Sequence, residues 1–305
     1  MTVHRASDGS DPTRLRVGVI GAGRVGSVLG AALDRVGHRV VAAGGVSQGS
    51  RRRAAALLPG VPLLPADEVV AVANLVLLAV PDDVLGPLVA GLADTGAWRP
   101  GQIVAHTSGA HGLDVLEPAA RAGVVPLALH PAMTFTGGTD DLARLSGCTF
   151  GVTAPEPFRP VAEALALEMG GSPAWVAEEA RALYHAALVV GANHLVTLVN
   201  DAADLLRRAG IDNPAAVLAP LLGAALDNAL RSGDAALTGP VSRGDAGTLT
   251  RHVATLAAQA PTSLPAYVAM ARLTADRALA SGRLKPAQAG AMLDALATRS
   301  DGARR

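Results

Sequence analysis

A glycine-rich segment near the N-terminus has the spacing needed to bind a phosphate-containing cofactor. It follows an apolar run at residues 15–20 and opens a helix-length segment that continues to about residue 36. The segment consists of Gly21, Ala22, Gly23, Arg24, Val25 and Gly26. In a G-x-G-x-x-G pattern the first glycine permits a tight turn, the second lets backbone approach a pyrophosphate, and the third lets helix and strand pack closely. The helix N-terminus favours phosphate charge, so this pattern predicts a dinucleotide-binding site; the alternative is a simple tight turn.

The residues after the second apolar run, Arg39–Ala43, indicate which dinucleotide is bound. An NAD site normally carries an acidic residue there to accept hydrogen bonds from the ribose hydroxyls, and this chain has none. Instead, the Ser47 hydroxyl and the guanidinium groups of Arg51 and Arg52 could hold a 2′-phosphate through charge-assisted hydrogen bonds. We therefore predict NADP(H) rather than NAD(H). The alternative is that the arginines at 51–53 are solvated on a surface helix, and at least one of them is expected to be so.

Further cofactor contacts are expected where the next apolar runs end, because ligands collect at the carboxyl ends of strands in open α/β sheets. Ala79, Val80 and Pro81 close the run at 75–80, and Thr107 follows the run at 102–106. We expect all four to lie beside the cofactor. The two aspartates after Pro81 have a simpler interpretation as the first turn of a helix, where carboxylates favour the dipole.

Two strand ends carry polar residues that could do chemistry. The first is His106 to Gly109, which includes Ser108, and the second is His130 to Phe135. Histidine suits proton transfer near neutral pH, and hydride delivery to a carbonyl needs a proton donor at the developing alkoxide. Either histidine could be that donor. The alternative for each is a histidine hydrogen-bonded into its own loop.

Polar residues also interrupt an apolar helix expected at about residues 179–209. They are Tyr184, His185, Asn193 and His194. His185 and Asn193 are eight residues apart, which at ~3.6 residues per turn places them about 80° apart on neighbouring faces. They could line one wall of a cleft, or they could hydrogen-bond other helices, since buried polar groups need partners.

A helix-breaking loop at residues 237–245 offers a candidate carboxylate-binding group. Arg243 could hold a substrate carboxylate as a bidentate fork. The alternative is that Asp245 caps the following helix and Arg243 pairs with it.

The composition fits a two-domain protein without a nucleic-acid partner. The chain has 305 residues, 50% hydrophobic and 17% charged, with a net charge of +0 and Lys285 as its only lysine. A prior of ~150 residues per domain gives two domains. A single cysteine, Cys148, excludes an intramolecular disulfide and a Cys-rich metal site, as in a reducing compartment. We expect no metal, no signal peptide, no membrane partner and a cytoplasmic location.

The order of apolar runs predicts an α/β fold followed by an all-helical domain. Short runs alternate with helix-length segments up to about residue 152, as in doubly wound parallel sheets of Rossmann type. The expected strands are 15–20, 39–43, 61–64, 75–80, 102–106, 124–129, 148–152 and 174–176. We expect a disordered leader at 1–14, an NADP-binding domain at 15–178, a helical domain at 179–298 and a disordered tail at 299–305. The first helix of the helical domain is apolar nearly all round, which predicts that it is buried.

In their order along the chain, these motifs resemble proteins that combine a Rossmann-like domain with a DUF2520 domain, within the 6-phosphogluconate dehydrogenase-like superfamily. The resemblance rests on residues 21–26, 78–83, 106–109, 130–135, 184–194 and 238–245. It implies an N-terminal dinucleotide-binding domain, a helical C-terminal domain, a site in the cleft between them and a homodimer. Some members resemble an alternative class of ketopantoate reductase, the NADPH-dependent enzyme of pantothenate synthesis. The superfamily also includes pyrroline-5-carboxylate reductase and the 3-hydroxyacid dehydrogenases.

The chain departs from one pattern of these relatives. The 3-hydroxyacid dehydrogenases and the better-known ketopantoate reductases use a lysine four residues before an asparagine on the interdomain helix. If Asn193 matches that asparagine, the lysine position is Val189, and Lys285 lies in a loop near the C-terminus. Any proton donor must then be a histidine, Tyr184 or water.

The leading hypothesis is an NADPH-dependent reductase of a small 2-oxo acid, with ketopantoate as the best single candidate. His130 or His185 would protonate the oxygen, Ser108 and Asn193 would orient it, and Arg243 would hold the carboxylate. The remaining expected substrate-binding residues are His106, Tyr184 and Asp245. One rival is an imine reductase of the pyrroline-5-carboxylate reductase type, for which a missing lysine is no handicap. Another is a non-catalytic NADP(H)-binding module that senses the nucleotide or binds a partner.

Overall fold

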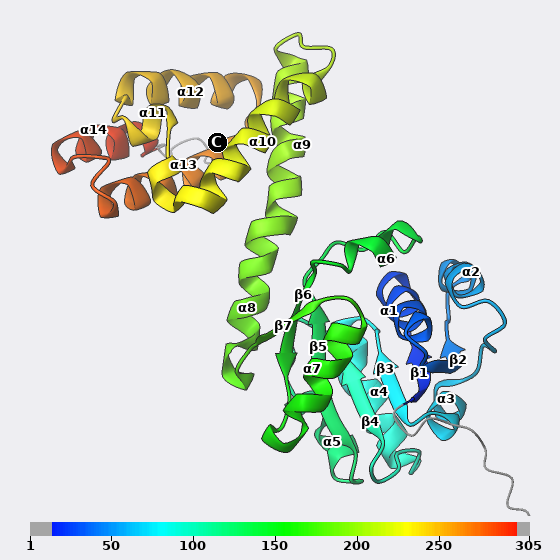
Figure 1. The fold of residues 1–305 in the computed structure, drawn as a ribbon. Helices are drawn as coiled ribbons and strands as arrows, with labels where there is room; N and C mark the ends of the chain where they lie inside the picture. The colour runs from blue at the N-terminus through cyan, green and yellow to red at the C-terminus, as the bar shows by residue number, and fades with distance from the viewer. Residues whose placement is uncertain (1–13, 298–305) are drawn as a thin grey trace, which may run out of the picture. The chain divides into compact units, whose positions relative to one another are not determined.

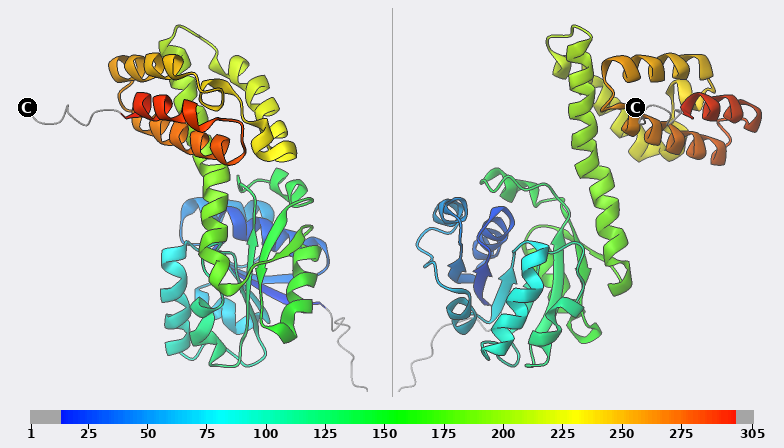
Figure 2. Two further views of the ribbon diagram at one scale, coloured as in Figure 1. Left: turned by 90° about the vertical axis from the view of Figure 1, so that its left-hand side faces the viewer. Right: turned by 180° about the vertical axis from the view of Figure 1, so that it is seen from behind.

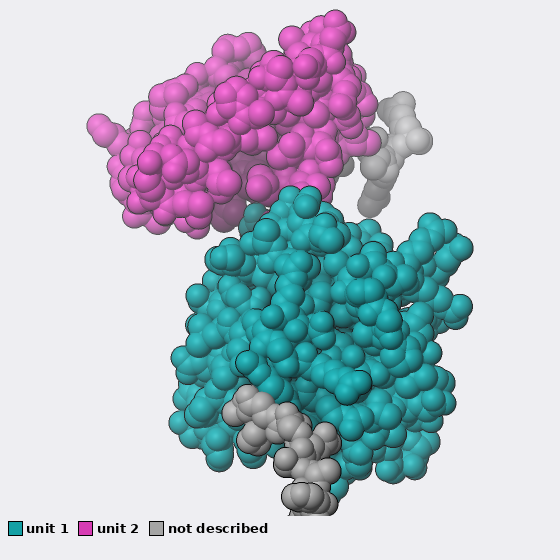
Figure 3. Space-filling model, turned by 45° about the vertical axis from the view of Figure 1, so that its right-hand side comes forward, with its two compact units in different colours: residues 1–191 teal, residues 192–305 magenta. Residues whose placement is uncertain are grey.

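The computed structural model of the chain describes residues 14–297 and divides into two compact units, residues 1–191 and 192–305 (Figures 1 and 3). Residues 179–191, which the sequence pattern placed in the helical domain, lie in the first unit. The expected leader at 1–14, apart from Arg14, and the expected tail at 299–305 lie outside the described residues.

Within the described residues, the first unit is built on a 7-stranded sheet in the order β2-β1-β3-β4-β5-β6-β7. The strands are β1 (Arg16–Ile20), β2 (Arg39–Gly44), β3 (Leu75–Leu78), β4 (Ile103–His106), β5 (Val125–Pro131), β6 (Thr149–Thr153) and β7 (Ser172–Trp175). β1 to β5 are parallel, β6 is antiparallel to β5, and β7 is parallel to β6. The strand order reverses beside β1, between β2 and β3, where doubly wound sheets bind ligands. The predicted α/β class is confirmed.

Helices cover both faces of this sheet (Figure 2). They are α1 (Arg24–Arg35), α2 (Gln48–Leu57), α3 (Ala66–Val72), α4 (Asp82–Asp94), α5 (Glu117–Ala120), α6 (Asp140–Arg144) and α7 (Arg159–Glu168), with 3₁₀ turns η1 (Asp114–Leu116), η2 (Glu156–Phe158) and η3 (Glu178–Ala180). One core joins Leu29 of α1 and Leu165 of α7 to the sheet, and the other joins Val69 of α3 and Val89 of α4. Because strands covered on both faces are apolar throughout, several runs in the sequence are continuous rather than alternating.

The prediction of a strand at residues 61–64 is wrong. This segment forms only an isolated bridge between Ala43 and Leu63. Pro62 and Pro65 flank the bridge, and a proline has no backbone N–H to donate to a ladder. The segment is therefore an extended link from α2 to α3.

The second unit is helical within the described residues. A continuous helix at residues 178–208 contains α8 (Arg181–Leu188) in the first unit, a π-helical turn η4 (Val189–Asn193) and α9 (His194–Arg208). Then come α10 (Pro214–Ser232), η5 (Gly233–Ala236), α11 (Gly239–Ser242), α12 (Ala246–Gln259), α13 (Leu264–Ala280) and α14 (Pro286–Leu296). The small core includes Leu249, Val268 and Met292. The helix-breaking loop expected at residues 237–245 lies between η5 and α12 and contains the short α11.

The prediction that the long apolar helix is buried is wrong for the single chain. Its most apolar window has a mean hydropathy of 1.5 and is 0% buried, and Leu183, Val190 and Val196 are 76%, 61% and 62% exposed. Among the described helices, this one alone is long and apolar enough to cross a membrane by length and composition. A helix that is apolar all round needs cover on every side, which the other helices of one chain do not supply.

Candidate functional site

A large cavity of about 1280 Å³ lies in the first unit, at the carboxyl ends of β1, β3, β4 and β5. Pockets for drug-sized ligands usually measure ~300–1,000 Å³, so this one has room for a ligand larger than those. Of the residues predicted from the sequence, the lining contains Gly21, Gly23, Arg24, Val25, Ser47, Arg51, Ala79, Val80, Pro81, Thr107, Ser108, His130 and His185. The cavity thus joins the expected cofactor loop to the expected chemistry.

The three glycines of the loop before α1 have three different physical roles. Gly21 has φ +92, and a Cβ there would lie 2.4 Å from the Ala79 carbonyl oxygen. A Cβ on Gly26 would lie 2.3 Å from the Gly21 carbonyl oxygen, so Gly26 permits close packing of helix and strand. A Cβ on Gly23 would meet nothing closer than 3.9 Å, and Gly23 lines the cavity. The space beside Gly23 is therefore open to a ligand in the cavity.

This arrangement fits the pyrophosphate of a dinucleotide. Gly23 is the N-cap of α1, and no side chain hydrogen-bonds that helix end. The first turn of a helix presents N–H groups and a positive dipole end to an anion. Ala22 and Gly26 are buried beneath the loop and do not line the cavity.

The start of α2 forms a second polar corner of the cavity. Ser47 caps the helix by accepting a hydrogen bond from the Ser50 N–H at 3.0 Å, and the two hydroxyls are 2.9 Å apart. The Arg51 Nε donates to the Gly45 carbonyl at 3.4 Å, and Arg51 lines the cavity. Arg52 is exposed and does not line it, as expected for the solvated member of the run. Ser50 was missed in the sequence analysis.

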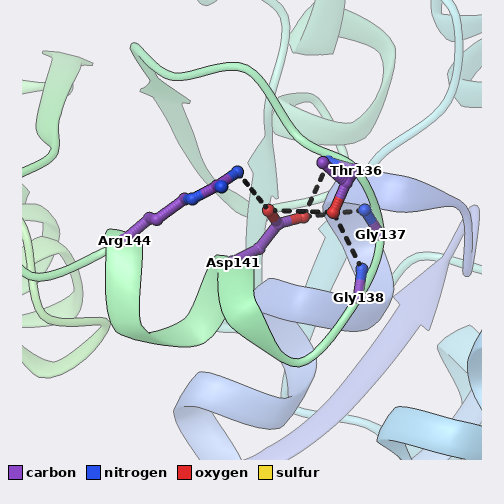
Figure 4. A network of polar contacts seen from close by, with 5 residues as sticks. All are labelled: Thr136, Gly137, Gly138, Asp141 and Arg144. Atoms are coloured by element: carbon purple, nitrogen blue, oxygen red, sulfur yellow. Dashed lines mark hydrogen bonds and ion pairs between the residues drawn. The ribbon is translucent and has the colours of Figure 1, made fainter.

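A buried aspartate, Asp141, fixes the loop after β5 through hydrogen bonds to its backbone (Figure 4). The Asp141 carboxylate is 0% exposed and accepts from the N–H groups of Thr136 and Gly137 at 2.8 and 2.7 Å. A Cβ on Gly137 would lie 2.6 Å from Arg53 Nε and 3.1 Å from Arg24 Cγ. The loop therefore packs against Arg24 at the start of α1 and Arg53 in the middle of α2.

An apolar wall completes the cofactor half of the cavity. It is formed by Val46, Leu63, Leu64, Pro65 and Ala66, with Val84 and Leu88 of α4. Val46 is 97% exposed, as an apolar side chain beside a ligand site can be. The sequence analysis missed this wall because it assigned residues 61–64 to a strand.

Two histidines and a serine meet at the other end of the cavity. The rings of His130 and His185 are edge to face, with centroids 6.0 Å apart. A Cβ on Gly109 would lie 2.6 Å from His185 Cδ2 and 3.0 Å from His130 Nε2, so only glycine fits between them. Ser108 and Gly109 also line the cavity. The result is a cluster of hydrogen-bonding groups at the position where a substrate would meet the cofactor.

The environment of His130 keeps its imidazole neutral. Burial, followed by the positive charge of Arg181 and the neighbouring His185, lowers the pKa of His130 to about 4. Its Nδ1 lies 2.9 Å from the Tyr184 hydroxyl oxygen. Tyr184 does not line the cavity, and burial raises its pKa. Near neutral pH this pair therefore consists of an uncharged imidazole and an uncharged phenol.

Two charged residues that sequence reasoning missed hold the loop after β4. The Arg181 side chain is buried and donates to the carbonyls of Ser108, His111 and Gly151 at 2.8, 2.8 and 3.0 Å. The Glu178 carboxylate accepts from the N–H groups of Leu113 and Asp114 at 2.8 and 3.2 Å. Both residues lie at the start of the helix that carries His185, so they tie that helix to the Ser108 loop. In the sequence they resemble ordinary polar residues at a helix start.

His106 lies in the same region but beneath the site. Its side chain is buried, its Nε2 is 2.8 Å from the Gly112 carbonyl, and its Nδ1 accepts from the Ser108 N–H at 3.2 Å. Burial lowers its pKa to about 4. With both nitrogens occupied and no surface on the cavity, His106 supports the Ser108 loop, which is the alternative considered from the sequence.

The other predicted residues lie in the second unit. Asn193 ends the π-helical turn, whose i→i+5 hydrogen bonds wind less tightly than an α-helix, so the 80° estimate for His185 and Asn193 does not apply. Asp245 caps α12 by accepting from the Thr248 N–H at 3.0 Å, and these bonds lower the pKa of its carboxyl group. Arg243 directly precedes that cap. Across residues 14–297 there is no cluster of three or more His, Cys, Asp or Glu side chains that could hold a metal.

A doubly wound sheet with a glycine loop at its switch point, followed by a helical unit, defines a Rossmann-type two-domain protein. The model of the Rossmann-like domain matches residues 1–131, and that of DUF2520, a domain of unknown function, matches residues 148–274. The chain belongs to the family that combines these two domains, as its motifs indicated. No curated protein matches the chain.

Solved structures with the same fold cover most of the chain. A protein assigned as an NADP oxidoreductase from Bacteroides fragilis is 22% identical, with a TM-score of 0.71, over 86% of this chain and 98% of its own. Protein TM1727 from Thermotoga maritima is 19% identical, with a TM-score of 0.62, over 87% and 99%. A reductive aminase from Aspergillus terreus, in complex with NADPH and ethyl levulinate, is 18% identical, with a TM-score of 0.61, over 92% and 99%. These similarities establish the fold.

Proposed function

We propose that this chain is an NADP(H)-dependent oxidoreductase that reduces a small 2-oxo acid, with ketopantoate as the first substrate to test. The observation that carries the proposal is the single cavity that has an open glycine, Gly23, at one end and the pair His130 and His185 at the other. The NADPH complex of the reductive aminase, a protein of the same fold, supports the choice of cofactor.

The residues of the cavity divide into holding and reacting groups. The Gly23 turn and the N-terminus of α1 would hold the pyrophosphate, and Ser47, Ser50 and Arg51 would hold the 2′-phosphate. When bound, NADPH supplies the hydride, and the protein supplies position and electrostatics. Ser108 would orient the substrate oxygen, and a histidine would donate a proton to it.

The test is the loss of reduced-nicotinamide absorbance when ketopantoate is added to the protein with NADPH, beside an identical sample with NADH. Oxidation of NADPH at least ~10-fold faster than that of NADH is the expected result, because a phosphate clamp contributes ~1.4 kcal/mol or more. If neither cofactor is oxidised, ketopantoate reduction is excluded.

Imine reduction is the second candidate, and two observations favour it. The position of the usual lysine acid is Val189, and His130 is neutral near neutral pH. A cyclic imine carries its own proton when its nitrogen is protonated, so it needs less acid catalysis than a ketone. Adding pyrroline-5-carboxylate in place of ketopantoate in the same assay distinguishes the two. If both substrates fail while NADPH still binds, the third candidate, a non-catalytic NADP(H)-binding module, is supported.

The partner we propose is a second copy of the chain. An exposed apolar surface of this kind marks an interaction site, and it includes the helix at 178–208 with Leu221 and Leu230 of α10. His185, Asn193 and His194 interrupt the helix near its middle, which is costly in lipid, so a homodimer is preferred over a membrane. Light scattering is expected to give twice the chain mass, and Val196→Asp to shift it towards the monomer. A monomeric wild-type protein would exclude the dimer.

A nucleic-acid partner is not proposed, because the net charge is +0. We propose a cytoplasmic location, since a single cysteine, Cys148, cannot form an intramolecular disulfide, as in a reducing compartment. Cys148 is buried and burial raises the pKa of its thiol, so this thiol is mostly protonated and poorly reactive.

A further inference from the structure

The side chains of His130 and Tyr184 are within hydrogen-bond distance. The Tyr184 hydroxyl oxygen is 2.9 Å from His130 Nδ1, and the two rings meet edge to face. A Cβ on residue 151 would lie 2.5 Å from that oxygen, so the phenol reaches this position only because residue 151 is glycine. Either atom can be the donor in this contact; when the phenol donates to Nδ1, the imidazole proton is on Nε2.

The Nε2 atom is on the side of the ring that faces the cavity. A Cβ on Gly109, a cavity-lining residue, would lie 3.0 Å from this atom, and His130 itself lines the cavity. A neutral imidazole with Nε2 protonated can donate a hydrogen bond to a substrate oxygen. The phenol behind it has no surface on the cavity and reaches a substrate only through this ring.

The positive charge of Arg181 favours an anion on Tyr184 and disfavours a cation on His130, whereas burial and Cys148 raise the pKa of Tyr184. The Arg181 guanidinium carbon is 5.8 Å from the centre of the Tyr184 ring, and its N–H groups donate to three backbone carbonyls. The charged and titratable groups that influence His130 are Arg181, His185 and Asp82, and those that influence Tyr184 are Arg181 and Cys148. Arg181 is therefore placed to stabilise a tyrosinate.

We propose that Tyr184 is the second donor in a proton relay that runs from its hydroxyl through His130 to the substrate oxygen, with Arg181 as the counter-charge. This inference rests on the proposed reductase function. As the substrate carbon accepts a hydride and its electron pair from NADPH, the oxygen gains negative charge. The Nε2–H bond of His130 breaks and an O–H bond forms on the substrate. The Tyr184 O–H bond breaks and an N–H bond forms at Nδ1. After the product alcohol leaves, the Nδ1 proton returns to the tyrosinate oxygen, and water in the cavity protonates Nε2, which restores the starting tautomer.

The relay makes a prediction that does not depend on turnover. In the full chain labelled with ¹⁵N-histidine, His130 is expected to be the neutral Nε2–H tautomer from about pH 5 to 8, since its pKa is about 4. Tyr184→Phe is expected to move the Nδ1 resonance towards that of a nitrogen with no hydrogen bond. A His130→Asn sample assigns the signal. A proton on Nδ1 in the wild-type protein would overturn the relay, because Nε2 could then donate nothing to a substrate.

Kinetics test the catalytic role with a matched control in the same chain. Tyr267 is the only other tyrosine, and its hydroxyl is 2.8 Å from His252 Nδ1 in the second unit, with the two rings also edge to face. With NADPH and ketopantoate, Tyr184→Phe is expected to lower kcat by ~10–100-fold at unchanged KM for NADPH, and Tyr267→Phe to leave both unchanged.

The outcomes separate the relay from the proposed function. If the wild-type protein oxidises NADPH with ketopantoate or pyrroline-5-carboxylate and Tyr184→Phe has the same kcat, the relay is overturned and the reductase function stands. If neither substrate is reduced by the wild-type protein, the reductase function is overturned, and the relay falls with it as a catalytic route. The tautomer measurement then decides only the direction of the hydrogen bond.

Discussion

The arginine run at the start of α2 gives the sharpest prediction, because two neighbouring arginines differ only in their position. Arg51 lines the cavity and Arg52 does not, and both are exposed. A hydrogen bond to a charged group contributes ~1.5–3 kcal/mol, and solvent screening reduces exposed pairs to ~1 kcal/mol or less. For an exposed guanidinium facing a phosphate dianion we take ~1–2 kcal/mol, which is a ~5–30-fold change in Kd. Arg51→Ala is expected to weaken NADPH binding by that factor.

The matched measurements are fluorescence titrations of NADPH and NADH with Arg51→Ala, Arg52→Ala and the wild-type protein. NADH has no 2′-phosphate, so its Kd is expected to be unchanged in both variants. Arg52→Ala is expected to leave the Kd of NADPH within about twofold, because an exposed charge outside the site is screened over ~10 Å at ~0.1 M salt. The NADPH preference of the wild-type protein is also expected to decrease as salt is added. Equal losses in the two variants, or equal losses for the two cofactors, would refute the phosphate clamp.

Three further predictions concern stability and the cofactor loop. Gly23→Ala is expected to weaken NADPH binding by at least ~10-fold at almost unchanged unfolding free energy. Gly26→Ala is expected to destabilise the fold by ~1–3 kcal/mol, since its Cβ would meet the Gly21 carbonyl. If Gly23→Ala lowered stability in thermal melts while Gly26→Ala changed only the NADPH titration, these roles would be refuted. Asp141→Ala is expected to cost about 3 kcal/mol in urea unfolding, because the partly buried N–H groups of Thr136 and Gly137 lose a charged acceptor, and a cost below ~1 kcal/mol would show that water replaces it. The depressed pKa of His106 means that the unfolded chain binds more protons than the folded chain between pH 6.5 and about 4, so stability is expected to fall as pH falls through that window. The His106 part of this loss reaches about 3 kcal/mol, and His130, whose pKa is also about 4, contributes over the same window. His106→Gln, which does not titrate, is expected to make the profile less steep, and a slope equal to that of the wild-type protein would exclude His106 as a cause.

Local patterns predicted the glycine loop and the strand ends in the cofactor half of the site, but not its apolar wall or Ser50. The roles of Gly21, Gly23 and Gly26 follow from the turn and the helix that contain them, so their spacing alone predicted the open position at Gly23. Ala79 and Thr107 followed from the rule that carboxyl ends of parallel strands meet at one edge. Each of these inferences uses residues close in the chain or one rule of sheet topology.

Contacts between distant segments could not be predicted in this way. Arg181 donates to the carbonyl of Ser108, 73 positions earlier in the chain, and Glu178 accepts from the Leu113 N–H, 65 positions earlier. Nothing in the local sequence distinguishes these two residues from a solvated helix start. The exposure of the apolar helix has a related cause, because periodicity indicates that a surface needs cover but not which chain supplies it.

His106 and His130 both end a strand, so residue type and position along the chain did not show which one supports a loop and which one lines the cavity. In the parallel register His106 lies beside Ala128, and His130 is two residues further along β5. Alternate residues of a strand point to the same face, so both imidazoles share a face, with His130 about 6.6 Å nearer the carboxyl edge. β5 continues to Pro131, whereas β4 ends at His106, and the loop after β4 folds over His106 and binds both of its nitrogens. The longer strand therefore brings His130 to the cavity and to Tyr184, and this difference depends on the register between strands rather than on either sequence motif.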